Sequence, residues 1–125
     1  MHTNKQKLNT ILMMGIAVAS LFITPDLNAQ DFNTFSACSV RARSALFLPP
    51  NFAAFLCRGS DSSVEPTLCV QLARYQITWA NSLDPIRLCS GTSDARERIS
   101  CFHDSRAHRY STFEGIMACG GRFNW

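Results

Sequence analysis

The spacing of the six cysteines constrains the fold of this chain more than any other feature. Successive cysteines are separated by 19, 12, 20, 12 and 18 residues, so that long and short steps alternate and the pattern recurs every 30 to 32 residues. A period between about 20 and 50 residues is typical of repeated supersecondary units. The spacing therefore predicts three copies of one unit. The cysteines are Cys38, Cys57, Cys69, Cys89, Cys101 and Cys119.

Residues beside the cysteines repeat in the same register. The second cysteine of each unit is followed two positions later by glycine, at Gly59, Gly91 and Gly121. The first cysteine of each unit is followed four positions later by a small residue and five positions later by arginine. This agreement at several offsets predicts units at about 31–59, 62–91 and 93–121. The equivalent arginines are Arg43, Arg74 and Arg106.

Each unit is expected to contain one long and one short helix. In the second unit, Glu65 and Pro66 suit the first turn of a helix, and Ser62 and Ser63 are candidate N-caps. Helical spacing of apolar residues then continues the long helix, and the segment 81–85 ends it. A short helix from Pro85 to about Cys89 follows. The residues at helical spacing are Leu68, Leu72, Tyr75 and Trp79.

The third unit repeats these signals. Asp94 with Glu97 resembles a capping pair, and Ser111 with Glu114 has the spacing of a capping box. In the first unit, Pro49 and Pro50 make the turn before a short helix over residues 52–57. No segment shows sustained alternation of apolar and polar residues, which a half-buried strand would require. The expected fold is all-α, an array of three αα-hairpins.

The cysteines are expected to form disulfides within this array. Each hairpin has one cysteine near the start of the long helix and one near the end of the short helix, and these two places lie side by side in an antiparallel hairpin. This favours pairing across the long steps, Cys38–Cys57, Cys69–Cys89 and Cys101–Cys119. All six cysteines lie at the same end of their hairpins, so pairing across the short steps stays open. Either way, a bridge that closes a loop of this length is worth about 3 kcal/mol.

The N-terminal segment has the features of a secretory signal peptide. Lys5 and Lys7 precede an apolar stretch over residues 11–23, and Pro25 and Ala29 follow it. The apolar stretch has 13 residues, fewer than the roughly 20 needed to span a bilayer as a helix, so an uncleaved anchor is the weaker alternative. We expect cleavage after Ala29, which leaves one domain at 30–125. An exported chain of this size with an even number of cysteines is typically rich in disulfides, which places the protein outside the cytoplasm, secreted or periplasmic.

The Leu-Cys-x-Gly motifs at Leu56 and Leu88, each with a further cysteine twelve residues after the first, resemble those of uncharacterised secreted bacterial proteins with cysteine-containing helical repeats of about 32 residues. The resemblance covers residues 38–121 and rests on Cys, Gly and small-residue positions. It implies export and a helical repeat, and it implies no activity.

Charge and motif content argue against several functions. Residues 30–125 contain ten arginines and no lysine against eight acidic residues, and the arginines are dispersed, whereas nucleic-acid binding typically uses a clustered basic face. The cysteines lack the short clusters of zinc sites and the Cys-x-x-Cys of redox motifs. His103 and His108 cannot share one helix face cleanly, and surface hydrogen bonds are the expected role of His108 and Asp104. We therefore expect no cofactor, no metal and no nucleic acid partner.

The candidate partner-binding residues are the arginine series and the aromatic C-terminus. A row of equivalent arginines could bind carboxylates or phosphates, although each arginine could instead cover its own hairpin. Phe123 and Trp125 could bind a partner or cover the open end of the last unit. We expect a non-enzymatic interaction or structural module whose partner is a protein or envelope component. The alternative is a small exported enzyme or enzyme inhibitor with a site assembled from scattered polar residues.

Overall fold

The structure is a computed structural model that describes the backbone of residues 23–125 and the side chains of residues 32–125. The chain divides into two compact units, Met1–Phe32 and Asn33–Trp125, and the second is described here by itself. Within residues 23–125 there are helices and no strands, which confirms the predicted all-α class. The helices are α2 (Ile23–Leu46), α3 (Pro50–Cys57), α4 (Glu65–Gln76), α5 (Asp84–Cys89), α6 (Ala95–Ala107) and α7 (Thr112–Ala118).

The predicted signal segment, 1–29, falls mostly outside the described residues. Its last seven positions belong to α2, which begins at Ile23, before the expected cleavage point after Ala29. In the described part of the chain, no helix has both the length and the apolar character required to cross a bilayer.

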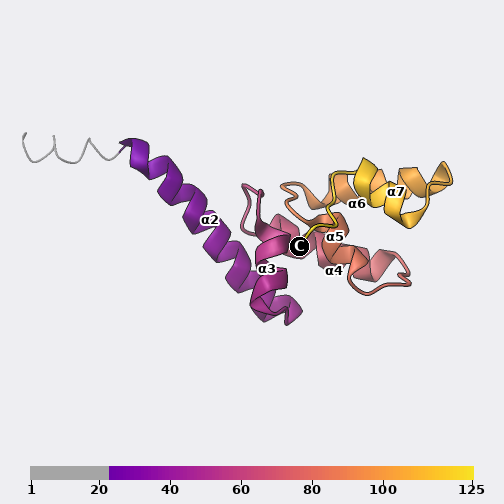
Figure 1. The fold of residues 1–125 in the computed structure, drawn as a ribbon, viewed down its shortest axis with the longest axis horizontal. Coiled ribbons are helices and arrows are strands. Elements are labelled where there is room, and N and C mark those ends of the chain that lie inside the picture. The colour runs from indigo at the N-terminus through magenta and orange to yellow at the C-terminus, as the bar shows by residue number, and fades with distance from the viewer. Residues whose placement is uncertain (1–22) are drawn as a thin grey trace, which may run out of the picture. The chain divides into compact units, whose positions relative to one another are not determined.

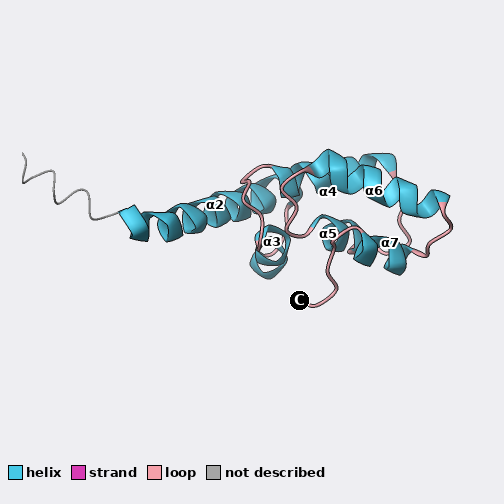
Figure 2. Ribbon diagram, turned by 90° about the horizontal axis from the view of Figure 1, so that it is seen from above, coloured by secondary structure: helices cyan, strands magenta, loops and turns pink. Residues whose placement is uncertain are grey.

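The helices of Asn33–Trp125 form three hairpins, each with a long helix followed by a short one (Figure 1). Figure 2 shows the long helices α4 and α6 in one layer and the short helices α5 and α7 in a second layer beneath them. The loops between hairpins, 58–64 and 90–94, connect the end of a short helix to the start of the next long helix. This arrangement places the short helices next to one another on one side of the array.

Each hairpin contains one disulfide that joins its long helix to its short helix. Cys38 pairs with Cys57 and Cys69 pairs with Cys89, with Cα–Cα distances of 5.8 and 5.6 Å. Cys101 pairs with Cys119 at 5.7 Å. Of the two pairings that the spacing left open, the structure has the one across the long steps.

Polar side chains begin the helices close to the predicted positions. The side chain of Asp94 accepts a hydrogen bond from the N–H of Glu97 at the start of α6, and Ser111 and Glu114 form a complete capping box at the start of α7. Helix α4 is preceded by Val64, and the hydroxyl of Ser62 accepts hydrogen bonds from the N–H groups of Val64 and Glu65. Ser62 therefore caps α4 from a position further upstream than an ordinary N-cap.

The short helices end at glycines in the left-handed region of φ. Gly59 and Gly91 have φ of 91° and 74°, and in the third hairpin this role passes to Gly120, with φ of 96°. The N–H of Gly121 donates to Ile116 O at 2.8 Å and that of Gly120 donates to Met117 O at 3.2 Å, which is a Schellman motif. Gly121 lies beyond the left-handed residue, so the third unit is offset by one position from the glycine pattern of the sequence.

In the second hairpin, the buried residues differ from the apolar residues that the sequence places at helical spacing. Helix α4 ends at Gln76, so Trp79 lies in the following loop, and Tyr75 is 88% exposed. The buried face of α4 is formed by Cys69, Val70 and Ala73. Trp79 still packs on the core: its ring lies 5.1 Å from that of Phe102, and its Nε1–H donates to Ala73 O at 2.9 Å.

Candidate interaction surface

The C-terminal residues after Gly121 lie against the short helices rather than extending from the last hairpin. The N–H of Arg122 donates to the carbonyl of Arg87 in α5 at 3.0 Å, which aligns this segment with the middle hairpin. Further along, the ring of Trp125 contacts Phe52 and Phe55 of α3, at centroid distances of 4.8 and 4.2 Å. The aromatic tail thus reaches the first hairpin, an outcome distinct from covering the end of the last one.

These contacts form a continuous series that we call the aromatic–arginine ladder. It runs from Phe113 in α7 to Phe123, at a centroid distance of 4.8 Å, and then to the Arg87 guanidinium, 5.0 Å from the Phe123 ring. Arg87 also lies 5.1 Å from the Trp125 ring, which contacts α3. The ladder consists of Phe52, Phe55, Arg87, Phe113, Phe123 and Trp125.

Apolar side chains of the ladder and its border remain open to solvent. Phe113 is 57% exposed and Trp125 is 47% exposed. Met117, which follows Phe113 by one helical turn and so lies on the same face of α7, is 48% exposed. Phe123 is half-buried between Phe113 and Arg87. Large apolar groups are therefore presented at a surface that is already ordered by its own contacts.

Arg87 is held between the two tail aromatics by a carboxylate. Its Nη1 lies 3.0 Å from Asp84 Oδ1, one turn earlier in α5, and this pair is mostly buried. A guanidinium over an aromatic face is attracted by the negative face of the ring, and partial removal from water strengthens that attraction. Asp84 thus fixes Arg87 in the position where it contacts both Phe123 and Trp125.

Arg122 connects the tail to the first two hairpins. Its guanidinium donates to Phe55 O at 3.1 Å and Arg58 O at 2.6 Å, both at the C-terminal end of α3, and to the Ser90 hydroxyl at 2.9 Å. The carbonyls at a helix C-terminus lack partners within the helix and carry partial negative charge. Burial, with a further effect from the positive charge of Arg58, lowers the pKa of Arg122 from its ordinary value.

Arg98 of α6 binds the end of the short helix of the middle hairpin, as Arg122 binds the end of α3. Its Nη1 donates to Leu88 O at 2.6 Å and Ser90 O at 3.1 Å, at the C-terminal end of α5. Burial lowers the pKa of Arg98, the positive charge of Arg122 lowers it further, and Glu97 acts in the opposite direction. Three arginines, Arg58, Arg98 and Arg122, therefore gather beside the helix ends next to the ladder, with carboxylates only partly offsetting them.

The predicted arginine series lies elsewhere. Arg43, Arg74 and Arg106 each occupy the last turn of a long helix, where a cation interacts favourably with the helix dipole, and all three side chains are exposed. Arg106 also donates to Thr112 Oγ1 at 3.0 Å and lies over the Phe102 ring at 5.8 Å, so it covers its own hairpin. The series therefore has a structural explanation that requires no ligand.

The side chains of His103 and His108, the two histidines among the described residues, each make one polar contact. His108 Nδ1 donates to the main-chain carbonyl of Asp104 at 2.9 Å, so its partner is the backbone rather than the carboxylate considered from the sequence. His103 Nε2 lies 3.2 Å from Gln76 Oε1. Among the residues whose side chains are described, no group of three or more His, Cys, Asp or Glu residues is placed to hold a metal ion.

The sequence identified Phe123 and Trp125 as candidate binding residues, and it gave no signal for Arg87, Arg98, Arg122, Phe113 and Met117.

Comparison of the chain with protein-family models, with curated proteins and with solved structures found no match.

Proposed function

We propose that this protein is an exported, non-enzymatic interaction module that binds a protein of the cell envelope or exterior through the aromatic–arginine ladder. The observation that carries the proposal is the exposed set of Phe113, Met117 and Trp125 beside ordered arginines. Aromatic residues, Met and Arg are enriched at the centres of protein interfaces, and Trp, Tyr and Arg dominate their binding energy. Because the ladder is ordered by its own contacts, little conformational entropy is lost when a partner binds.

Export is supported by the disulfides and by the N-terminal segment. Three intramolecular disulfides join all six cysteines, and such bridges persist in oxidising environments. The signal-peptide pattern before Ala29 and the resemblance to secreted repeat proteins agree with that environment. Cell fractionation, with N-terminal sequencing of the mature chain, tests this part. We expect protein outside the cytoplasm that begins at Gln30, and intact cytoplasmic protein would contradict export.

The chemistry of the ladder defines the partner. Arg58 and Arg122 are present beside the ladder in excess of Asp84, the one carboxylate paired with an arginine there. We therefore expect an apolar surface on the partner protein that is bordered by Asp or Glu. Complementary charges would accelerate association and select the partner, whereas the aromatic contacts would supply most of the affinity.

The test compares capture by three forms of the oxidised protein. The double variant Phe113→Ala, Met117→Ala removes exposed apolar groups from the ladder and its border, and Tyr75→Ala removes an even more exposed aromatic from α4 as a control. A partner should be captured by wild type and by Tyr75→Ala and lost with the double variant. With the purified partner, we expect the double variant to raise Kd at least tenfold, or by about 1.4 kcal/mol or more.

An unchanged Kd for the double variant, with wild-type circular dichroism, would contradict the role of the ladder. Equal loss of binding with Tyr75→Ala would place the interface on the long helices instead.

A further inference from the structure

The three disulfides differ in their access to solvent. Cys69 and Cys89 are 0% exposed, and Cys38 and Cys57 are 0% and 1% exposed. Cys101 and Cys119 are both partly exposed. A thiol reagent could therefore reach the bridge of the third hairpin from the folded state, whereas the first two bridges would first require the structure to open.

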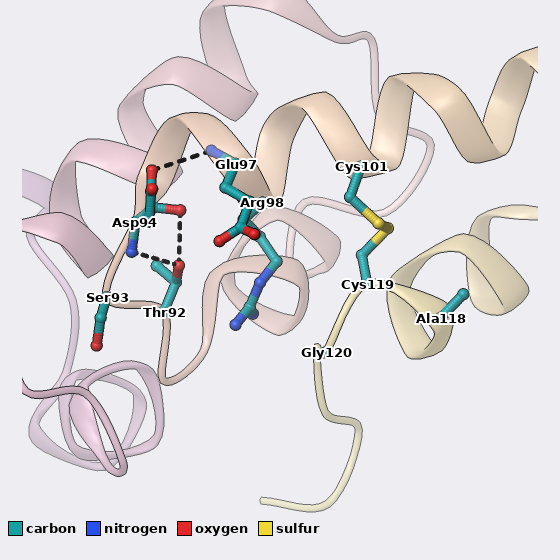
Figure 3. Close-up of a pocket in the computed structure, with 9 residues that line it drawn as sticks. All are labelled: Thr92, Ser93, Asp94, Glu97, Arg98, Cys101, Ala118, Cys119 and Gly120. Atoms are coloured by element: carbon teal, nitrogen blue, oxygen red, sulfur yellow. Dashed lines mark hydrogen bonds between the residues drawn. A yellow bond between two sulfur atoms is a disulfide. The ribbon is translucent and has the colours of Figure 1, made fainter.

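The exposed bridge lies between two surface clefts. One, of about 430 Å³, is lined by both of its cysteines together with the start of α6 and Gly120 (Figure 3). The other, of about 310 Å³, is lined by the same two cysteines, by α6 residues that include Asp104, and by His108, which follows α6. Each cleft provides space beside the disulfide for an approaching thiol.

A cationic side chain lies in the larger cleft. A Cβ added at Gly120, the residue after Cys119, would meet the guanidinium of Arg98 at 3.3 Å, so this charge lies close to the bridge. Figure 3 shows the Arg98 side chain extending into the cleft from α6, on the same side as the disulfide and Gly120. A nearby cation stabilises a thiolate and so favours its departure from a disulfide. Asp94 and Glu97 line the same cleft and offset part of this effect.

We propose that Cys101–Cys119 is the thiol-reactive site of this protein, at which low-molecular-weight thiols undergo thiol–disulfide exchange with the folded chain. The thiolate of the reductant attacks one sulfur of the bridge, the S–S bond breaks, and the other cysteine leaves as a thiolate that takes a proton from water. A second reductant thiolate then attacks the reductant sulfur of the mixed disulfide, the bond to the protein sulfur breaks, and this cysteine also leaves as a thiolate that takes a proton from water. In total, two reductant thiols are oxidised to one disulfide, and the protein bridge gains two electrons and two protons.

The third hairpin has contacts that hold it together after reduction. Gly115 of α7 packs so closely on α6 that an added Cβ would lie 2.5 Å from Ser105 Oγ and 3.0 Å from the Phe102 ring. The Schellman bonds at the end of α7 and the arginine bonds of the tail also do not depend on the bridge. Reduction therefore releases a covalent link beside the ladder, at the junction of α7 and the tail, without unfolding the first two hairpins.

The test is timed reduction of the oxidised full chain by reduced glutathione, followed by alkylation and mass spectrometry of the peptides. We expect Cys101 and Cys119 to be labelled at least about tenfold faster than the other four cysteines, with the helical circular dichroism retained. In guanidinium-unfolded protein, this preference should disappear.

A second measurement separates direct access from local unfolding. Reduction of an exposed bridge in the folded state should not accelerate in low, sub-denaturing urea, whereas reduction through opening should accelerate. Equal labelling of all three bridges in native buffer, or a rate for Cys101–Cys119 that rises steeply with low urea, would overturn the proposal.

Discussion

The guanidinium of Arg122 donates a hydrogen bond to the carbonyl oxygen of Phe55, 67 positions earlier in the chain, and lies 5.4 Å from the centroid of that residue's ring. One side chain near the C-terminus thereby satisfies main-chain carbonyls at the end of α3 and contacts an aromatic residue of the core. Through Ser90 it also binds the middle hairpin. The order of the ladder therefore depends on Arg122.

Replacement of Arg122 should destabilise the array and release the tail. In Arg122→Met, the carbonyls of Phe55 and Arg58 lose a charged donor, and hydrogen bonds to charged groups are worth about 1.5–3 kcal/mol. We expect the free energy of unfolding to fall by about 2 kcal/mol, measured by urea denaturation. Trp125 fluorescence, isolated in a Trp79→Phe background, should shift to longer wavelength.

Arg74→Met provides the matched control, because Arg74 is exposed in the last turn of α4. Its effect should stay within about 0.5 kcal/mol. If the two variants unfold at the same urea concentration, the network around Arg122 contributes no net stability.

Local signals in the sequence predicted the hairpins. The capping residues Asp94 and Ser111 act on N–H groups three positions later, so their spacing along the chain directly reports the contact. The cysteine period likewise predicted three disulfide-linked hairpins, since each bridge closes a loop of 18 to 20 residues within one hairpin. Features that act within one hairpin were accessible from sequence.

Features that depend on contacts between hairpins could not be predicted from the sequence. Tyr75 and Val70 both belong to α4, but only the packing of neighbouring helices makes Val70 buried and leaves Tyr75 exposed. The partners of Trp125 and Arg122 lie in the first and second hairpins, and no residue near them in the sequence specifies these partners. A repeated arginine position drew attention to Arg43, Arg74 and Arg106, whereas the arginines with tertiary roles occur at non-repeated positions.

Glu65 should stabilise the boundary between the second and third hairpins. Its Oε1 accepts a hydrogen bond of 2.6 Å from the N–H of Ala95, so a carboxylate at the start of α4 also caps the start of α6. This bond is charge-assisted and lies at a positive helix terminus. In Glu65→Ala we expect a loss of about 1–2 kcal/mol in the free energy of unfolding.

Glu97→Ala is the control for Glu65→Ala. Glu97 is an exposed carboxylate in the first turn of the same helix, α6, and its removal should cost only about 0.3–0.5 kcal/mol through the helix dipole. Equal losses for the two variants in parallel urea titrations would mean that Glu65 acts only through its charge.

Gly121 should not tolerate a side chain. A Cβ at this position would lie 2.5 Å from the carbonyl oxygen of Arg87 and 2.5 Å from Cγ2 of Ile116, and a main-chain oxygen within α5 has little freedom to move. Gly121→Ala would push the tail away from α5 and weaken the bond from Arg122 N–H to Arg87 O. We expect a loss of about 2–3 kcal/mol, as for overpacking of a filled site.

Gly59→Ala tests the cost of backbone strain alone, because an added Cβ at this position would not clash with a neighbouring atom as it would at Gly121. Its φ is 91°, and the nearest atom to an added Cβ is the end of the Arg122 side chain at 3.8 Å. The expected loss is about 1 kcal/mol. Thermal unfolding monitored by circular dichroism would rank the two variants, and a larger loss for Gly59→Ala would contradict the close approach of the tail to α5.

Removal of single disulfides should separate two contributions to the free energy of unfolding, namely the closure of a loop and the burial of the sulfur atoms. The bridges Cys69–Cys89 and Cys101–Cys119 have sequence separations of 20 and 18, so their removal should increase the entropy of the unfolded chain almost equally, worth about 3 kcal/mol each. Replacing both cysteines of a pair by Ala also removes sulfur atoms from the folded state. Of these two pairs, Cys69–Cys89 is the fully buried one, so its removal also leaves a cavity in the core, at an additional cost of about 1 kcal/mol.

We therefore expect Cys69→Ala, Cys89→Ala to unfold at lower urea than Cys101→Ala, Cys119→Ala, and both to unfold below wild type. The second pair variant should retain the helical spectrum of the wild type, because Gly115 still packs α7 on α6. If the Cys101, Cys119 variant proved the less stable of the two, the exposed bridge would support more of the folded state than its burial indicates. That result would also mean that reduction at this bridge unfolds the third hairpin rather than releasing only a covalent link.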